Sequence, residues 1–239
     1  MALTLAEIFQ GSFNLIFVII SIIVGIKIMT KYVENKNSDF ILVGITWIGI
    51  STPWMHGAIA FVLLFFNIIL MEEIRFIIGY VFIPVITVLW LHVFTNFLHK
   101  EKKKLILLLY AIICLVCEIL FFTFLVTNRV ALIGYFERTF SAVYRPFVRF
   151  TLLFFLATAL ITFLLFAKQS LKSGDAEVRL KGKFLIVAFL TYVACAILDS
   201  FFLFDPVTVV LVRLFLISSA IEFYFGWIMP DWLKRRLSK

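Results

Sequence analysis

Seven apolar segments, each about as long as a membrane-spanning helix, fill most of this 239-residue chain. About 20 apolar residues cross the hydrocarbon core of a bilayer as a helix. A helix is forced there because an unpaired backbone group finds no water. The segments cover residues 8–30, 40–69, 74–98, 105–126, 146–167, 184–204 and 207–229. The sequence therefore predicts an all-α, polytopic membrane protein, in which residues 1–239 form a single bundle of seven transmembrane helices.

The charges between these segments favour one orientation. Sixteen of the 22 Lys and Arg residues follow the first, third, fifth and seventh segments, and lysine and arginine are in excess in cytoplasmic loops. We therefore expect the N-terminus outside the cell membrane and the basic tail 230–239 in the cytoplasm. The same distribution accounts for the net charge of +8 without a nucleic-acid partner. It leaves the lipid bilayer, and a cytoplasmic protein that contacts the basic loops, as expected partners.

Proline and aspartate mark interruptions in the segments. Pro53 and Pro84 lie inside the second and third segments, where each removes a backbone hydrogen bond and is expected to kink its helix. Asp205 and Pro206 separate the sixth and seventh segments. This pair predicts a tight turn, with Asp205 as the N-cap and Pro206 at the first helical position.

Two further pieces of the chain combine aromatic or aliphatic residues with charges. They are residues 127–141 (TNRVALIGYFERTFS) and residues 231–237 (DWLKRRL). Such a mixture is typical of a short amphipathic segment at the membrane interface, so we expect both pieces to lie there. The tail is too short to be an output domain.

Ionisable residues inside a membrane are costly, and each is therefore a candidate functional residue. Asp199 lies six residues before Asp205, and Arg213 lies seven residues after Pro206. At a rise of about 1.5 Å per residue, both lie about 10 Å below the outer surface on adjacent antiparallel helices. They are therefore predicted to form an ion pair.

The same depth estimate adds three residues to this layer. The predicted outer cluster comprises Glu118, Arg145, Arg149, Asp199 and Arg213. Its formal charge of +1 suits a carboxylate or phosphate ligand that enters from outside or from the outer leaflet. The alternative is a set of mutual salt bridges that only fix how the helices pack.

A second group of polar residues lies nearer the cytoplasm. The predicted inner cluster comprises His92, Asn96, Glu222 and Tyr224, and Glu222 is placed to pair with His92 or Lys183. Hydrogen bonds between membrane helices would explain such a group. The alternative is a conformational latch or a proton site.

No pattern of residues indicates a cofactor or a catalytic group. His56 and His92 lie at depths of about 20 and 30 Å, too different for the axial ligands of one haem, and both are expected to be satisfied core histidines. No metal-binding motif or serine-hydrolase motif occurs. Cys114, Cys117 and Cys195 lie in apolar segments and are expected to be core residues.

Seven helices with this orientation resemble the topology of retinal proteins and G-protein-coupled receptors. Residues 207–229 contain no lysine for a retinal Schiff base, and neither the acidic-Arg-Tyr nor the Asn-Pro-x-x-Tyr receptor motif occurs. Residues 218–237 (SSAIEFYFGWIMPDWLKRRL) resemble the end of uncharacterised archaeal seven-transmembrane proteins. The layout is also similar to the seven-helix input region of some membrane histidine kinases. These resemblances imply a fold and no activity.

The favoured hypothesis is a non-retinal, receptor-like or sensory protein that binds an anionic or lipidic ligand in its outer half. A small or proton-coupled transporter is the alternative, with Asp199, Glu118 and Glu222 as titrating groups. A third hypothesis is a membrane-embedded enzyme that modifies a lipid, with Glu118 or Asp199 as the acid. The sequence specifies neither the ligand nor the oligomeric state.

Overall fold

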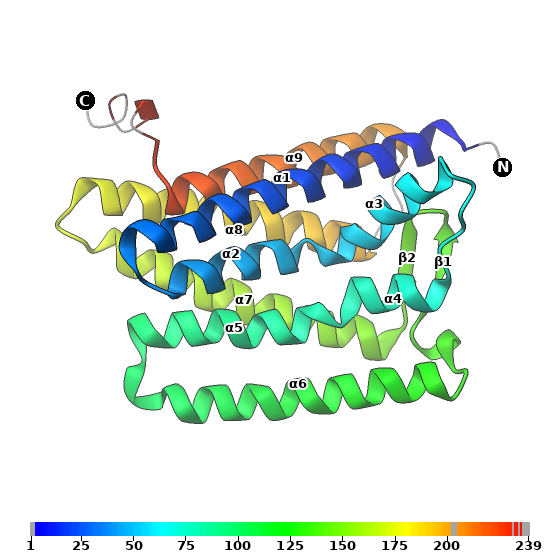
Figure 1. Ribbon diagram of the computed structural model, residues 1–239, viewed down its shortest axis with the longest axis horizontal. Coiled ribbons are helices and arrows are strands. Elements are labelled where there is room, and N and C mark those ends of the chain that lie inside the picture. Colours follow the sequence, from blue (N-terminus) through cyan, green and yellow to red (C-terminus); the bar gives the residue numbers. More distant parts are fainter. Residues whose placement is uncertain (1–2, 202–204, 231, 234, 236–239) are drawn as a thin grey trace.

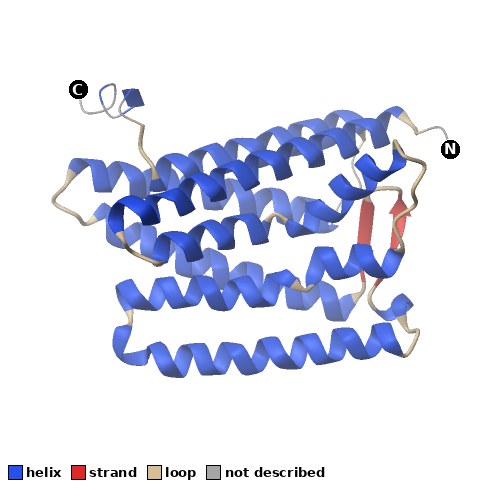
Figure 2. Cartoon of the chain, in the orientation of Figure 1, coloured by secondary structure: helices blue, strands red, loops and turns tan. Residues whose placement is uncertain are grey.

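The structure is a computed structural model that describes residues 3–201, 205–230, 232, 233 and 235. Long helices run side by side, and a small two-stranded sheet lies across one end (Figures 1 and 2). The helices are α1 (Leu5–Asn35), α2 (Asp39–Ile50), α3 (Thr52–Leu64), α4 (Glu72–Tyr80), α5 (Phe82–Leu98), α6 (Lys103–Val126), α7 (Pro146–Leu171), α8 (Ala176–Phe201) and α9 (Pro206–Trp227). Short 3-10 turns, η1 (Lys100–Lys102) and η2 (Val130–Leu132), precede and follow α6.

Six helical segments in the described part of the chain are long and apolar enough to cross a membrane, and the bent pair α2–α3 makes up to seven. The segment Glu72–Leu98, which contains α4 and α5, counts as one of the six. This confirms the prediction of an α-helical integral membrane protein. The bundle ends differ: one carries the sheet and the start of α1, and the other carries the lysine-rich connections (Figure 1). We call them the hairpin end and the basic end.

The predicted interruption at Pro53 is confirmed, and it is a break between two helices. Helices α2 and α3 meet at Ser51 with a bend of 60°. Proline has no amide hydrogen to donate to the carbonyl four residues earlier, which is that of Gly49. The Gly49 carbonyl accepts a hydrogen bond from the Thr52 hydroxyl instead, at 2.8 Å. The Ile50 carbonyl accepts a hydrogen bond from the hydroxyl of Tyr192 on α8, also at 2.8 Å. The second apolar segment therefore forms two helices, of which α3 ends at Leu64. The prediction of one helix over residues 40–69 is wrong.

The third segment is also interrupted near its proline, but its two helices still count as one span. Helix α4 ends at Tyr80, four residues before Pro84, and α5 starts at Phe82. The turn before α9 follows the prediction, because the Asp205 side chain accepts hydrogen bonds from the backbone amides of Val207 and Thr208.

Helix packing leaves α6 at the side of the bundle, against α5 (Figure 1). The other helices enclose a core rich in aromatic rings, such as Trp47 stacked on Phe223 at 3.9 Å between ring centroids. Helices α1 and α2 approach closely at two glycines: a Cβ atom on Gly44 would lie 2.5 Å from the carbonyl oxygen of Gly25. Small residues at such points allow membrane helices to pack backbone against backbone.

The segment 127–141, expected as a short amphipathic piece at the membrane interface, folds as a turn and a hairpin. It contains η2 and most of an antiparallel hairpin of strands β1 (Gly134–Arg138) and β2 (Ser141–Tyr144), in which Gly134 pairs with Tyr144. Ile133 and Phe140 are buried against the helices, so the hairpin covers the end of the bundle. The expected interfacial piece at 231–237 lies mostly outside the described residues.

Candidate functional site

A cavity of about 290 Å³ lies between the helices at the hairpin end. It sits beside the break between α2 and α3, since Ile50, Pro53 and Trp54 all line it. Residues from α1, α5, α7, α8, α9 and the hairpin complete the wall. Most of the lining is apolar, but polar and charged side chains also contribute to it. An apolar wall with placed polar groups is usual for a small-molecule site.

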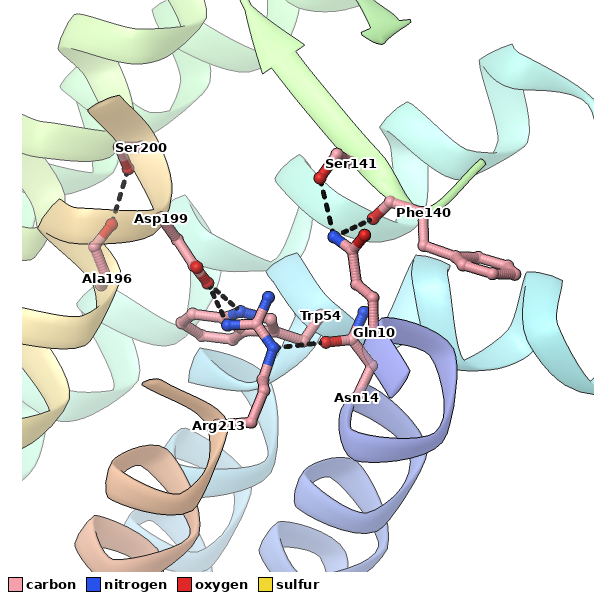
Figure 3. Close-up of polar contacts among 9 residues, drawn as sticks. All are labelled: Gln10, Asn14, Trp54, Phe140, Ser141, Ala196, Asp199, Ser200 and Arg213. Carbon is pink, nitrogen blue, oxygen red and sulfur yellow. Dashed lines mark hydrogen bonds and ion pairs between the residues drawn. The ribbon is translucent and has the colours of Figure 1, made fainter. Parts of the chain in front are cut away.

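The predicted ion pair between Asp199 and Arg213 forms in the wall of this cavity (Figure 3). Arg213 also donates from Nε to the Asn14 Oδ1 atom at 2.7 Å, and the Trp54 indole nitrogen donates to Asp199 Oδ2 at 2.6 Å. Helices α1, α3, α8 and α9 are therefore joined by one polar network. Arg213 is 4% exposed, so its positive charge is balanced inside the protein by Asp199.

The turn of the hairpin is held over the cavity by polar contacts from two helices. Gln10 on α1 donates to the Ser141 hydroxyl at 2.7 Å and to the Phe140 carbonyl at 3.4 Å (Figure 3). The carboxylate of Glu7, also on α1, accepts a hydrogen bond from the hydroxyl of Thr139. Arg75 on α4 donates to the Thr139 carbonyl at 2.5 Å. These contacts make the hairpin a cover for the cavity.

The structure divides the predicted outer cluster. Arg149 lines the same cavity as Asp199 and Arg213, and its guanidinium carbon lies 5.8 Å from the centre of the Phe201 ring. Arg145 does not line this cavity. It precedes α7 as its N-cap, where its guanidinium lies over the Tyr135 ring at 5.3 Å.

Glu118 is also separate from the cavity, because α6 packs at the side of the bundle. Both carboxylate oxygens are buried and have no hydrogen-bond partner among the described residues. The five residues therefore do not form one cluster. Depth alone could not show this, since it gives the height of a residue along a helix but not the direction in which it points.

The predicted inner cluster also forms only in part. Lys103 on α6 donates to the Asn96 Oδ1 atom at 2.6 Å and lies 3.1 Å from the His92 Nε2 atom. Asn96 in turn donates to the carboxylate of Asp39 at 2.9 Å. This inner network joins α2, α5 and α6 at the basic end. Lys103 was missed because it was counted only as a loop charge, and Asp39 was not singled out because it adjoins a loop.

The other two members of the inner cluster lie elsewhere. Glu222 accepts a hydrogen bond from Ser218 at 2.8 Å, one turn earlier on α9, and pairs with neither His92 nor Lys183. Tyr224 is partly buried and packs near the ring of Phe225. These positions give no support to a joint site of His92, Asn96, Glu222 and Tyr224.

His56 departs from the expectation of a satisfied core histidine. It lines the cavity and is 3% exposed, and its Nδ1 atom has no hydrogen-bond partner in the described part of the protein. Gln10, Asn14 and Tyr144 are further polar lining residues that the sequence did not single out. Gln10 and Asn14 are four residues apart in an apolar segment, and this spacing places them on one helix face.

The cavity offers hydrogen-bond donors, acceptors and an apolar wall. Within the residues that the structure describes, no group of three His, Cys, Asp or Glu side chains could hold a metal ion. The arrangement is suited to binding a small amphiphilic molecule. Comparison with protein-family models, with curated proteins and with solved structures finds no match for this chain.

Proposed function

We propose that this chain is a receptor-like or sensory protein of the cell membrane, with seven transmembrane helices, that binds a small amphiphilic ligand in the cavity at the hairpin end. One observation carries the proposal. The cavity is lined by long helices and the hairpin, and its lining combines an apolar wall with polar groups, several of which are held in place by hydrogen bonds. A ligand there would touch the polar network of Asp199 and Arg213, and so could change how α8 and α9 pack.

The proposed orientation places the hairpin end outside the cell. The basic end carries the lysines of the connections after α1, α5 and α7, as cytoplasmic loops do. The start of α1 and the end of α9 lie at opposite ends of the bundle (Figure 1), which fits an odd number of crossings. A cytoplasmic protein that contacts these basic loops would complete the signalling pathway. The resemblance to archaeal seven-transmembrane proteins is consistent with this proposal.

The binding test uses a cavity-filling variant and a matched control. Ala196 lines the cavity, whereas Ala111 is an exposed residue on α6. Binding of radiolabelled octanoate and 1-octanol is measured with the protein in nanodiscs, and binding to empty nanodiscs is subtracted. We expect Ala196→Phe to abolish saturable binding and Ala111→Phe to preserve it. Equal binding by the native protein and Ala196→Phe would contradict the proposal.

The receptor part of the proposal needs a response at the other end of the molecule. Gly174 is an exposed residue between α7 and α8, and a Cβ atom at this position would have no heavy atom within 4 Å. A fluorophore on Gly174→Cys would report on this loop without disturbing packing. We expect the ligand to change its fluorescence in the otherwise native protein and not in the Ala196→Phe background. A bound ligand that leaves the fluorescence unchanged would argue against a sensory role.

A proton-coupled carrier is the second candidate, and Glu118 favours it. A buried carboxylate without hydrogen-bond partners among the described residues, in a membrane segment, is a candidate proton site. Asp199 is less suited to that role because Arg213 and Trp54 occupy its Oδ2 atom. Ligand uptake into proteoliposomes that Glu118→Gln abolishes would favour the carrier. Binding without uptake would favour the receptor.

A further inference from the structure

Three buried polar atoms that can donate hydrogen bonds, His56 in the tautomer with its proton on Nδ1, gather near the hairpin side of the cavity. They are the Arg75 Nε, His56 Nδ1 and Tyr144 hydroxyl atoms, which have no hydrogen-bond partner among the described residues. Arg75 is 8% exposed and His56 is 3% exposed. An unsatisfied buried polar group costs about 1–3 kcal/mol. Such groups are therefore rarely left without a role.

Two neighbours bring these side chains together. The Phe136 ring lies beneath the Arg75 guanidinium, with 3.5 Å between its centre and Cζ, and its centre is 5.6 Å from that of the His56 ring. A Cβ atom on Gly79 would lie 2.7 Å from the Tyr144 hydroxyl and 3.1 Å from His56 Cδ2. Helices α3 and α4 and strand β2 therefore converge on this point. We call Arg75, His56 and Tyr144 the donor cluster.

The donor cluster carries a positive charge that no carboxylate in the described residues balances by an ion pair. Arg75 uses one Nη2 hydrogen for the Thr139 carbonyl and forms no salt bridge there. Burial raises the pKa of the Tyr144 hydroxyl above its usual value, so this group keeps its proton and can donate. The environment thus favours an acceptor that is negatively charged, since hydrogen bonds to charged groups are stronger than those between neutral groups.

Arg75 itself lies behind the lining residues His56 and Tyr144, and the charged side chains that do line the cavity are less suited to an anion. Arg213 is already paired with Asp199 and Asn14. Arg149 shares the lining with Glu137, an exposed carboxylate of opposite charge. The donor cluster is the place where a carboxylate would gain the most, because it would satisfy buried groups that have no partner among the described residues.

We propose that the ligand is a medium-chain carboxylic acid in its anionic form. Its carboxylate accepts hydrogen bonds from His56 and Tyr144, with the Arg75 guanidinium behind them, and its hydrocarbon chain lies along the apolar wall. His56 and Tyr144 both line the cavity. Its volume of about 290 Å³ suits a medium chain rather than a long one, since it lies at the lower end of the range of about 300–1,000 Å³ for ligand pockets. The inference rests on the proposed binding function and specifies its ligand.

The test compares two probes that differ in the head group, octanoate and 1-octanol, with the protein in nanodiscs. We expect the native protein to bind octanoate at least about tenfold more tightly than 1-octanol, because only octanoate offers a charged acceptor. Tyr144→Phe removes one donor and keeps the ring. It should weaken octanoate binding about tenfold and change 1-octanol binding little. His56→Leu, a second variant, should act in the same direction.

Tyr110→Phe is the matched control, because the Tyr110 hydroxyl pairs with Thr158 at 3.0 Å, and Tyr110 does not line the cavity. It should leave the binding of both probes unchanged. If both probes bind equally and Ala196→Phe blocks both, the cavity binds ligands but the carboxylate site is wrong. If neither probe shows binding that Ala196→Phe removes, both the binding function and the carboxylate site are wrong.

Discussion

The ion pair between Asp199 and Arg213 should contribute strongly to stability, and Arg213→Met tests this. The Arg213 side chain is 5% exposed and that of Asp199 is 18% exposed. Removing one partner of a buried pair leaves an uncompensated charge and costs about 3–5 kcal/mol. At about 2–4 °C per kcal/mol for a chain of this size, the melting temperature should fall by at least about 6 °C. The measurement is thermal unfolding in detergent, followed by tryptophan fluorescence.

A double-mutant cycle separates the pair from its surroundings. Asp199→Asn keeps the shape of the side chain and an acceptor for Trp54, but leaves Arg213 without its counter-ion. The double variant Asp199→Asn with Arg213→Met contains neither charge. It should therefore be more stable than the sum of the single effects predicts, by about 2 kcal/mol, within the usual range for residues in direct contact.

An exposed ion pair of the same protein provides the control. Lys31 and Glu34 lie one turn apart on α1, with their nitrogen and oxygen 2.6 Å apart and side chains 31% and 63% exposed. Lys31→Met should cost less than about 1 kcal/mol, because water screens such a pair. The reasoning is refuted if the Asp199–Arg213 cycle gives a coupling below about 0.5 kcal/mol, or if Arg213→Met costs no more than Lys31→Met.

Three further predictions concern other parts of the bundle. Gly44→Ala should cost about 1–3 kcal/mol of unfolding free energy, since its Cβ would meet backbone 2.5 Å away. Gly174→Ala, with open space around it, should be neutral when the unfolding free energy of both variants is measured by titration with SDS. Lys103→Met removes the donor to Asn96 and should lower the melting temperature by a few degrees, which a lysine-to-methionine change in the basic tail should not do. Hydrogen bonds at the start of α9 hold the pKa of Asp205 below its usual value. The stabilisation by Asp205 is therefore full above the unfolded pKa of about 3.9 and is lost as the pH falls through the folded pKa, so the destabilisation by Asp205→Ala, read from melting curves, should shrink at acidic pH.

The sequence predicted those features that depend on position along one helix or across one short turn. Asp199 and Arg213 lie on consecutive antiparallel helices at similar distances from Asp205. Their depth along these helices was therefore enough to predict the ion pair. Pro53 marked a break because the missing amide is a local property of the chain. The N-cap at Asp205 is local in the same sense.

The sequence could not predict contacts that depend on how each helix is rotated and where it packs. Glu118 was expected in the layer of Asp199 and Arg213, but α6 lies at the side of the bundle, away from the cavity. Lys103 reaches Asn96 on α5 because long lysine side chains extend beyond their own position. The hairpin was missed although residues 134–144 contain two tyrosines, two phenylalanines and a valine, residue types that favour strands.

The break between α2 and α3 and the cavity beside it depend on the same side chain. The break leaves carbonyl groups without helical partners, and in a membrane such groups must find donors inside the protein. Tyr192 supplies one of them to Ile50 and at the same time lines the cavity. A ligand that moved Tyr192 would therefore leave the Ile50 carbonyl without this donor. Under the proposed function, ligand binding would therefore be linked to the geometry of the bend, and α2 would extend this effect to the basic end of the bundle, where it begins at Asp39.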